Sequence, residues 1–264
     1  MTATNSHVGP LVAARRSEGE GLLIGYLPVG FPDFDTSVDA MVALADNGCD
    51  AIEMGLPYSD PVMDGPAIQR AAQAALDGGF RTTDVFRAIA QVRSRVDVPV
   101  LVMTYWNPVI QYGVDRFADD LAAAGGAGLI TPDITADSAA DWIAASDRTG
   151  LDRVFLAAPS STDERLRMAV DASRGFVYAT STMGITGARA ALDAAARGLV
   201  GRLRAVGADS VCVGIGISTR DQVTEVQSFA DGAIVGAALV GSLADGGVGS
   251  LAAKAAELSG RAPH

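Results

Sequence analysis

Eight short apolar segments recur along the chain, a few tens of residues apart, and most are bounded by polar residues, glycine or proline. Continuous apolar runs of this length are typical of strands that are covered on both faces. They span residues 22–27, 51–54, 100–103, 129–131, 154–156, 176–179, 211–213 and 233–235. We therefore expect a sheet whose strands lie between two other layers.

The segments between these strands have helical periodicity, and several begin with helix start signals. Residues 82–84, 135–138 and 161–164 supply Ser, Thr and Asp just before an apolar helical pattern. Alternating strands and helices predict a parallel sheet, either closed as a barrel or open and doubly wound. No composition shift marks a boundary, so residues 1–264 are expected to form one domain. Residues 246–250 are interpreted as a loop before a final helix over 251–258.

Composition narrows the class of protein. At 264 residues and 49% hydrophobic content the chain can bury a substantial core. Its 31 acidic and 20 basic side chains include no Lys/Arg cluster, which argues against a nucleic-acid partner. The polar start and short apolar runs predict neither a signal peptide nor a membrane span, hence a cytoplasmic protein. Cys49 and Cys212 are too few for a disulfide framework and are expected to be buried thiols.

The densest chemical signal is the run over residues 51–69, which starts as a strand and continues as a loop with three carboxylates. The two-residue strand period turns Glu53 away from Ile52 and Met54, toward the mouth of a barrel, where an unpaired carboxyl has a raised pKa. Asp60 and Asp64 follow. Each either caps a turn or joins Glu53 in general acid and base work.

Glycine clusters follow the last three predicted strands, at residues 184–187, 214–216 and 236–237. Any one of them alone is more often a turn than a site. Three at successive strand ends favour a phosphate site built from backbone N–H groups and a helix N-terminus. An acidic protein can hold a phosphate in this way without side-chain cations.

The sequence lacks the residues that several other reaction mechanisms require. Lys254, in the terminal helix, is the sole lysine, and His7 and His264 lie near the chain ends. A Schiff base needs a lysine in the pocket, and a metal aldolase normally needs histidine ligands. No Cys/His cluster offers a metal site. We therefore expect a reaction that uses carboxylates, tyrosine and backbone dipoles, with no metal.

The stretch from Glu53 to Pro66 resembles the alpha subunit of tryptophan synthase. It carries Glu, Gly, Pro, Ser, Asp and Pro in the order that is typical of that family. Supporting matches over the whole chain are Tyr105-x-Asn107-Pro108, Pro132-Asp133, Tyr178, Gly184-x-Thr186-Gly187, Gly214-x-Gly216 and Gly236. The resemblance implies a single (β/α)8 TIM barrel with an extra N-terminal helical segment.

By this resemblance the chain is a carbon–carbon lyase that cleaves indole-3-glycerol phosphate to indole and glyceraldehyde 3-phosphate in tryptophan biosynthesis. Asp64 accepts a hydrogen bond from indole N1–H while the ring becomes positively charged. Glu53 moves protons between indole C3 and the C3′ hydroxyl. Tyr178 has an accessory role, although an aromatic residue there could equally be part of the core.

The resemblance also assigns the surroundings of the substrate. The phosphate contacts are Gly187, Gly216, Gly236 and Ala237, and the loop-closing residue is Thr186. The apolar indole slot is Tyr26, Met103 and Ile130, which by default would be core residues. Two positions depart from the best-known members: Ala237 replaces a serine, and Thr182 replaces an arginine of the loop after the sixth predicted strand.

Family members of this kind work with a beta subunit, which carries pyridoxal phosphate, in an α2β2 heterotetramer with allosteric coupling. The chain itself is expected to need no cofactor. The resemblance places Pro57, Ser59, Asp60, Asn107 and Pro108 at the partner surface, with Asp60 in a coupling role. Two alternatives stay open: another phosphate-binding barrel, such as an isomerase or epimerase, or a subunit that activates its partner and has little activity of its own.

Overall fold

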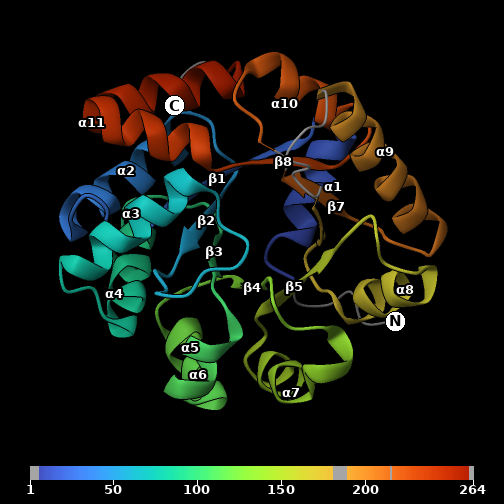
Figure 1. Cartoon of the computed structure of the whole chain (residues 1–264), viewed down its shortest axis with the longest axis horizontal. Helices are drawn as coiled ribbons and strands as arrows, with labels where there is room; N and C mark the ends of the chain where they lie inside the picture. Colours follow the sequence, from blue (N-terminus) through green and yellow to red (C-terminus); the bar gives the residue numbers. More distant parts are fainter. Residues whose placement is uncertain (1–5, 181–188, 215, 262–264) are drawn as a thin grey trace.

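Eight parallel strands close into a barrel in the computed structural model, which describes residues 6–180, 189–214 and 216–261 (Figure 1). The closure is made by β1 and β8, where Leu22 pairs with Gly232 and Ile24 with Ile234. The prediction of a barrel, rather than an open sheet, is therefore confirmed. The strands are β1 (Leu22–Pro28), β2 (Ala51–Gly55), β3 (Val100–Met103), β4 (Gly128–Thr131), β5 (Asp152–Ala157), β6 (Val177–Thr180), β7 (Val211–Gly214) and β8 (Gly232–Val235).

Helices surround the strands (Figure 1). The predicted start signals over residues 82–84 and 161–164 lie at helix starts, whereas residues 135–138 form a separate 3-10 turn and the helix after it has no side-chain cap. Thr162 caps α8 by accepting from the Arg165 N–H, and Asp84 accepts from the Arg81 N–H at the start of α4, at 2.8 Å. The helices are α1 (Gly9–Ser17), α2 (Phe34–Asp46), α3 (Pro66–Asp77), α4 (Thr82–Arg93), α5 (Trp106–Tyr112), α6 (Val114–Ala123), the 3-10 turn η1 (Ala136–Ser138), α7 (Ala140–Thr149), α8 (Asp163–Ala172), α9 (Arg189–Ala205), α10 (Arg220–Gln227) and α11 (Ala237–Ser259).

The loop predicted over residues 246–250 is wrong in its extent. Helix α11 runs through this region and is interrupted only at Gly246 and Gly247, whose backbone angles are not helical. Residues 248–250 are helical again, and both halves of α11 bury apolar side chains: Leu239, Val240 and Leu243 before the interruption, and Leu251, Ala255 and Leu258 after it. Tertiary packing here outweighs the low helix propensity of glycine.

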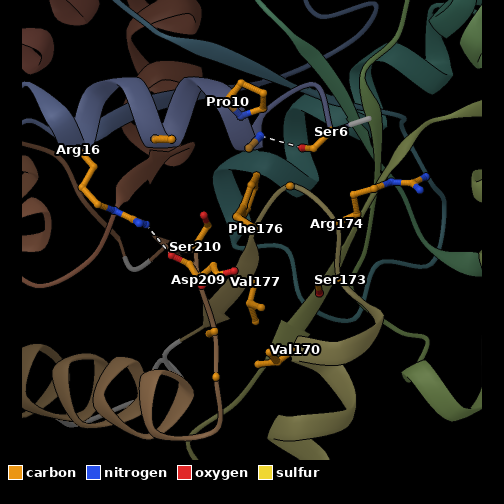
Figure 2. Close-up of a pocket in the computed structure, with 15 residues that line it drawn as sticks. Ser6, Pro10, Arg16, Val170, Ser173, Arg174, Phe176, Val177, Asp209 and Ser210 are labelled. Carbon is orange, nitrogen blue, oxygen red and sulfur yellow. Dashed lines mark hydrogen bonds between the residues drawn. The ribbon is translucent and has the colours of Figure 1, made fainter. Parts of the chain in front are cut away.

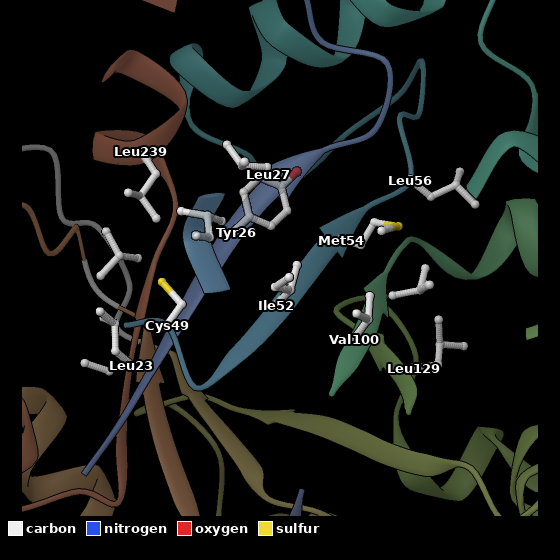
Figure 3. Packing of buried hydrophobic residues seen from close by; sticks show 14 of the residues in the cluster. Leu23, Tyr26, Leu27, Cys49, Ile52, Met54, Leu56, Val100, Leu129 and Leu239 are labelled. Carbon is white, nitrogen blue, oxygen red and sulfur yellow. The ribbon is translucent and has the colours of Figure 1, made fainter. Parts of the chain in front are cut away.

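The core has two shells, and strand residues enter them alternately. Leu22, Ile24 and Phe176 belong to a cluster inside the barrel. Ile52 and Met54 point outward, into the cluster between strands and helices (Figure 3). Glu53 therefore faces inward, as the two-residue period predicts. Cys49 lies in the outer shell and Cys212 in the inner one, and both are buried free thiols, as expected.

The predicted extra N-terminal helix is α1, which lies at the N-terminal end of the barrel. Three acidic residues near strand starts hold it there, of which Asp50 and Asp152 are buried and Asp231 is half-buried. Asp50 accepts from Arg15 at 2.6 Å, and Asp231 accepts from Arg16 at 2.8 Å. Asp152 accepts from the backbone N–H of Val8 at 2.9 Å. A cavity of about 550 Å³ separates α1 from the segments that lead into β6 and β7 (Figure 2).

Candidate active site

A second cavity, of about 200 Å³, opens at the C-terminal end of the barrel. Barrel enzymes have their active sites at this end. Side chains and backbone from seven of the eight strands or from the loops after them line it. Among the residues predicted from the sequence, the lining includes Glu53, Asp64, Tyr178, Gly216, Gly236, Ala237, Tyr26 and Met103.

Glu53 lies on β2 in the wall of this cavity, and only 1% of it is exposed. Its Oε2 atom is buried without a hydrogen-bond partner among the described residues. Burial, followed by the nearby charge of Asp64, raises the pKa of Glu53 to about 8. The carboxyl is therefore protonated at neutral pH and can both donate and recover a proton there.

Asp64 reaches the same cavity from the loop after β2 and is only partly exposed. Burial raises its pKa, while a hydrogen bond from the Tyr105 phenol opposes this rise. Of the two carboxyl groups, Glu53 is the more deeply buried and Asp64 is the one with a donor beside it. Different surroundings of this kind allow one group to work as an acid while the other stays ionised.

The remaining walls are largely apolar. Tyr26, Met103 and Tyr178 line the cavity, and burial raises the pKa of Tyr26 and of Tyr178 well above the ordinary value. Both phenols therefore stay neutral. The structure adds lining residues that sequence reasoning missed: Met63, Ile68, Leu156, Thr180, Ile217 and Ile234. Leu156 and Ile234 lie at alternate strand positions that point into the barrel, as Glu53 does. This alternation could have identified them in the sequence as lining residues.

Ile130 is placed differently from the prediction. It is fully buried in the cluster inside the barrel and does not line the cavity. Its register neighbours are Met103 on β3 and Val154 on β5, and Val154 belongs to the same interior cluster. The stagger of the strands thus places Ile130 below the cavity, where it supports the apolar wall.

Glycines and a helix N-terminus form the side of the cavity near β7 and β8. Gly236 directly precedes α11, and Gly236 and Ala237 both line the cavity. The first N–H groups of a helix have no partner within it, so they can receive an anion. Gly216 adopts a positive φ of 51° beside them. Gly187, Thr186 and Thr182 lie outside the described residues.

The residues predicted for the partner surface come from two adjacent segments. Asn107 donates from its side-chain amide to the Tyr58 hydroxyl at 3.2 Å, and Ser59 donates to Asp60 at 2.6 Å. Ser59, Asp60 and Asn107 are exposed, Pro108 is half-buried, and Pro57 is buried.

Three apolar side chains on these segments are exposed, and no sequence pattern predicted this. Val62 is 77% exposed, Met63 49% and Ile110 51%. Exposed apolar residues on neighbouring segments are typical of a surface that binds another protein.

Within residues 6–180, 189–214 and 216–261, no cluster of three or more His, Cys, Asp or Glu side chains could hold a metal ion. In the same part of the chain, no helix combines the length and the apolar character that crossing a membrane requires.

Taken together, fold and cavity define a (β/α)8-barrel protein with a buried carboxyl group and a second carboxyl group in a ligand-sized cavity. The family profile described as tryptophan synthase alpha chain matches residues 12–259, and the chain belongs to this family. A tryptophan synthase alpha chain from Leifsonia xyli subsp. xyli is 67% identical, over 96% of this chain and 97% of that protein. One from Mycobacterium avium is 56% identical, over 96% of this chain and 93% of that protein.

Solved structures agree with the sequence comparison. A Mycobacterium tuberculosis tryptophan synthase structure superimposes with a TM-score of 0.92 at 53% identity, over 97% of this chain and 98% of that chain. A structure of the a2b2 tryptophan synthase complex from Pyrococcus furiosus gives a TM-score of 0.83 at 34% identity, over 92% of this chain and 99% of that chain.

Proposed function

We propose that this chain cleaves indole-3-glycerol phosphate into indole and glyceraldehyde 3-phosphate, with Glu53 and Asp64 as the two working carboxyl groups. The observation that carries this assignment is the buried Glu53, whose pKa is raised to about 8 in the same cavity as Asp64. An apolar wall suits the indole ring, and the N-terminus of α11 suits the phosphate.

Protonated Glu53 donates its proton to indole C3, and the ring becomes an indolenine cation. The Asp64 carboxylate accepts a hydrogen bond from N1–H and stabilises the positive charge where it develops. The carboxylate of Glu53 then takes the proton from the C3′ hydroxyl. The C3–C3′ bond breaks, its electron pair returns to the ring, and C3′ becomes the aldehyde carbon. Glu53 ends the cycle protonated.

The other residues hold the substrate in this scheme. The backbone N–H groups around Gly216, Gly236 and Ala237 bind the phosphate, together with Gly187. Ala237 offers no hydroxyl, so this contact is made by the backbone alone. Tyr26 and Met103 flank the indole ring, and Tyr178 has an accessory role beside it.

The chain works with a beta subunit in an α2β2 assembly, as in the a2b2 complex of the relative from Pyrococcus furiosus. The partner carries the pyridoxal phosphate, and this chain needs no cofactor of its own. Exposed Val62, Met63 and Ile110 lie beside Asp60 and Asn107 and extend the proposed partner surface. Two buried free thiols suit the reducing cytoplasm, where we place the protein.

The test is indole release from indole-3-glycerol phosphate by Glu53→Gln and Asp64→Asn, each alone and with saturating beta subunit. We expect each substitution to lower kcat by roughly a hundredfold or more, because each removes a group that acts in the transition state. Glu164→Gln and Asp171→Asn alter exposed carboxyl groups on α8 and serve as matched controls with unchanged rates.

Unchanged release from Asp64→Asn would overturn the assignment of that residue. The same samples also separate catalysis from partner regulation. If inactive Glu53→Gln still activates the beta subunit, the two roles of this chain rest on different residues.

A further inference from the structure

One tyrosine that carries no role in the scheme above ties the loop with Asp64 to the barrel. The Tyr105 hydroxyl oxygen accepts hydrogen bonds from two successive backbone N–H groups, Val62 at 3.1 Å and Met63 at 3.0 Å. Asp64 is the next residue along the chain. Tyr105 itself is only 5% exposed. A single buried oxygen therefore anchors the backbone directly before a proposed catalytic carboxylate.

Side-chain packing does little to hold this stretch of the loop. Val62 is 77% exposed and Met63 49%, so burial of their side chains cannot fix their positions. Hydrogen bonds to the backbone remain as the means of fixing the loop. The Gln69 side-chain amide donates to the Asp64 carbonyl oxygen at 2.8 Å, and the Val62 and Met63 N–H groups donate to Tyr105. The last two bonds end on the same phenol, so its removal releases both at once.

Tyr105 is held firmly in turn. It follows β3 and precedes α5, where Asp133 accepts from the Trp106 N–H at 2.8 Å. Its ring also packs against Tyr58, which lies earlier in the same loop as Asp64, with 5.4 Å between the ring centres. Tyr105 is therefore positioned by β3 and by the loop after β4, and neither of these belongs to the loop that carries Asp64.

The phenol proton has one evident use. The two backbone N–H groups occupy the acceptor side of the oxygen, which leaves the O–H group free to donate. The Asp64 carboxylate is the acceptor nearest in chemistry to this proton, and the phenol lowers the pKa of Asp64 against the effect of burial. The other titratable groups that face this part of the cavity are Glu53, Tyr26 and Tyr178.

We propose that Tyr105 is a positioning residue of the lyase reaction, which pins the loop through the Val62 and Met63 N–H groups and aims the Asp64 carboxylate into the cavity. The inference rests on the role proposed above for Asp64. Tyr105 does not touch the reacting atoms; it acts through Asp64.

The test compares Tyr105→Phe with the unaltered chain, both in complex with the beta subunit. We expect kcat/KM for indole release to fall on the order of tenfold to a hundredfold, because a misplaced group and a lost donor each cost about this much. The loss falls mainly on kcat, since Asp64 acts most strongly on the charged ring. The acid limb of the pH profile moves to higher pH, because the Asp64 carboxylate loses a donor that keeps it ionised.

Tyr112→Phe is the matched control. Its hydroxyl donates to Asp120 at 2.5 Å, also a phenol-to-carboxylate bond, but on α5 and α6 outside the cavity. We expect this variant to keep the unaltered kcat and pH profile. The ring is retained in both variants, and circular dichroism and Tm check the fold. The midpoint of the acid limb does not depend on the folded fraction, so it stays decisive if Tyr105→Phe is less stable.

Asp64→Asn, measured in parallel, separates the two proposals. If Asp64→Asn is inactive while Tyr105→Phe keeps the unaltered kcat and acid limb, the positioning role is overturned and the role of Asp64 stands. If Asp64→Asn is fully active, the proposed role of Asp64 fails, whatever Tyr105→Phe does. A fall in kcat with an upward shift of the acid limb, absent from Tyr112→Phe, supports the positioning role.

Discussion

At the scale of single residues, the feature that matters most is the placement of Glu53 in the barrel interior. The Glu53 carboxyl group is 1% exposed, and one of its oxygens has no hydrogen-bond partner among the described residues. Its pKa of about 8 keeps it mostly neutral below that pH. This neutral form is useful for proton donation at physiological pH. The same burial carries a cost in stability whenever the unfolded chain can ionise and the folded chain cannot.

That cost predicts how stability depends on pH. Below pH 4.5, the ordinary pKa, Glu53 is protonated in both states and has no effect. As pH rises from 4.5 to about 8, the unfolded chain loses the proton while the folded chain keeps it, so the contribution of Glu53 to stability falls. Glu53→Gln removes this loss of stability, which amounts to about 1.4 kcal/mol for each unit by which folding raises the pKa. We expect a variant that is more stable than the unaltered chain at pH 8, by a few kcal/mol at most, and nearly equal at pH 4.5.

Urea unfolding at a series of pH values measures this difference, with exposed Glu164→Gln as the control that shows none. A stability difference that does not grow between pH 4.5 and 8 would show that Glu53 is ionised in the folded protein.

At the scale of elements, α1 is attached mainly through buried acidic residues. Asp152 is fully buried and accepts from the Ser6 hydroxyl and the N–H groups of His7 and Val8, at 2.9–3.0 Å. Only Val8 and Val12 of the residues around α1 are buried apolar side chains. Polar contacts therefore carry much of the attachment, and hydrogen bonds to a buried charge are among the stronger ones in proteins.

Asp152→Ala should loosen α1 from the barrel. We expect a loss of about 3 kcal/mol, since the donors of Ser6, His7 and Val8 all lose their acceptor. Trypsin cleavage after Arg15 and Arg16 should become faster, because both residues lie in α1. Denaturant unfolding and timed proteolysis with mass spectrometry measure the two effects. Asp171→Ala, at an exposed position of α8, should change stability by less than about 0.5 kcal/mol. Equal behaviour of the two variants would contradict the role of Asp152.

At the scale of the whole molecule, barrel closure joins the two ends of the chain. β1 pairs with β8, so the first and last strands complete one sheet, and we propose that residues 1–264 fold as one domain. The cavity takes its lining from seven strands or the loops after them. A substrate bound there contacts segments that are far apart in sequence, and its binding should stabilise the barrel as a unit.

This predicts a rise in unfolding free energy with ligand. At a concentration one hundred times Kd, a bound phosphate ester adds about 2.7 kcal/mol. Gly236→Ala should weaken the effect, because a Cβ atom at this position comes within 3.2 Å of Tyr26 and narrows the cavity. Gly249→Ala is the matched control on α11, since a Cβ there meets no atom within 4 Å. Thermal unfolding with and without glycerol 3-phosphate measures the stabilisation by ligand. Equal stabilisation of both variants would show that the phosphate does not bind beside Gly236.

The sequence by itself determined the order of strands and helices, the inward direction of Glu53 and the residues of most of the proposed site, because local period and motif order depend only on neighbouring residues. Leu156 lines the cavity and Ile130 does not, because strand stagger is decided only when the barrel closes. Ile68 on α3 and Ile217 on the loop after β7 line the cavity because their segments pack over the end of the barrel. The raised pKa of Glu53 was expected from its position, but its size depends on the surrounding burial. The anchoring of the Asp64 loop by Tyr105 joins residues more than forty positions apart. Contacts of this kind exist only in the folded chain, where segments distant in sequence share one desolvated space.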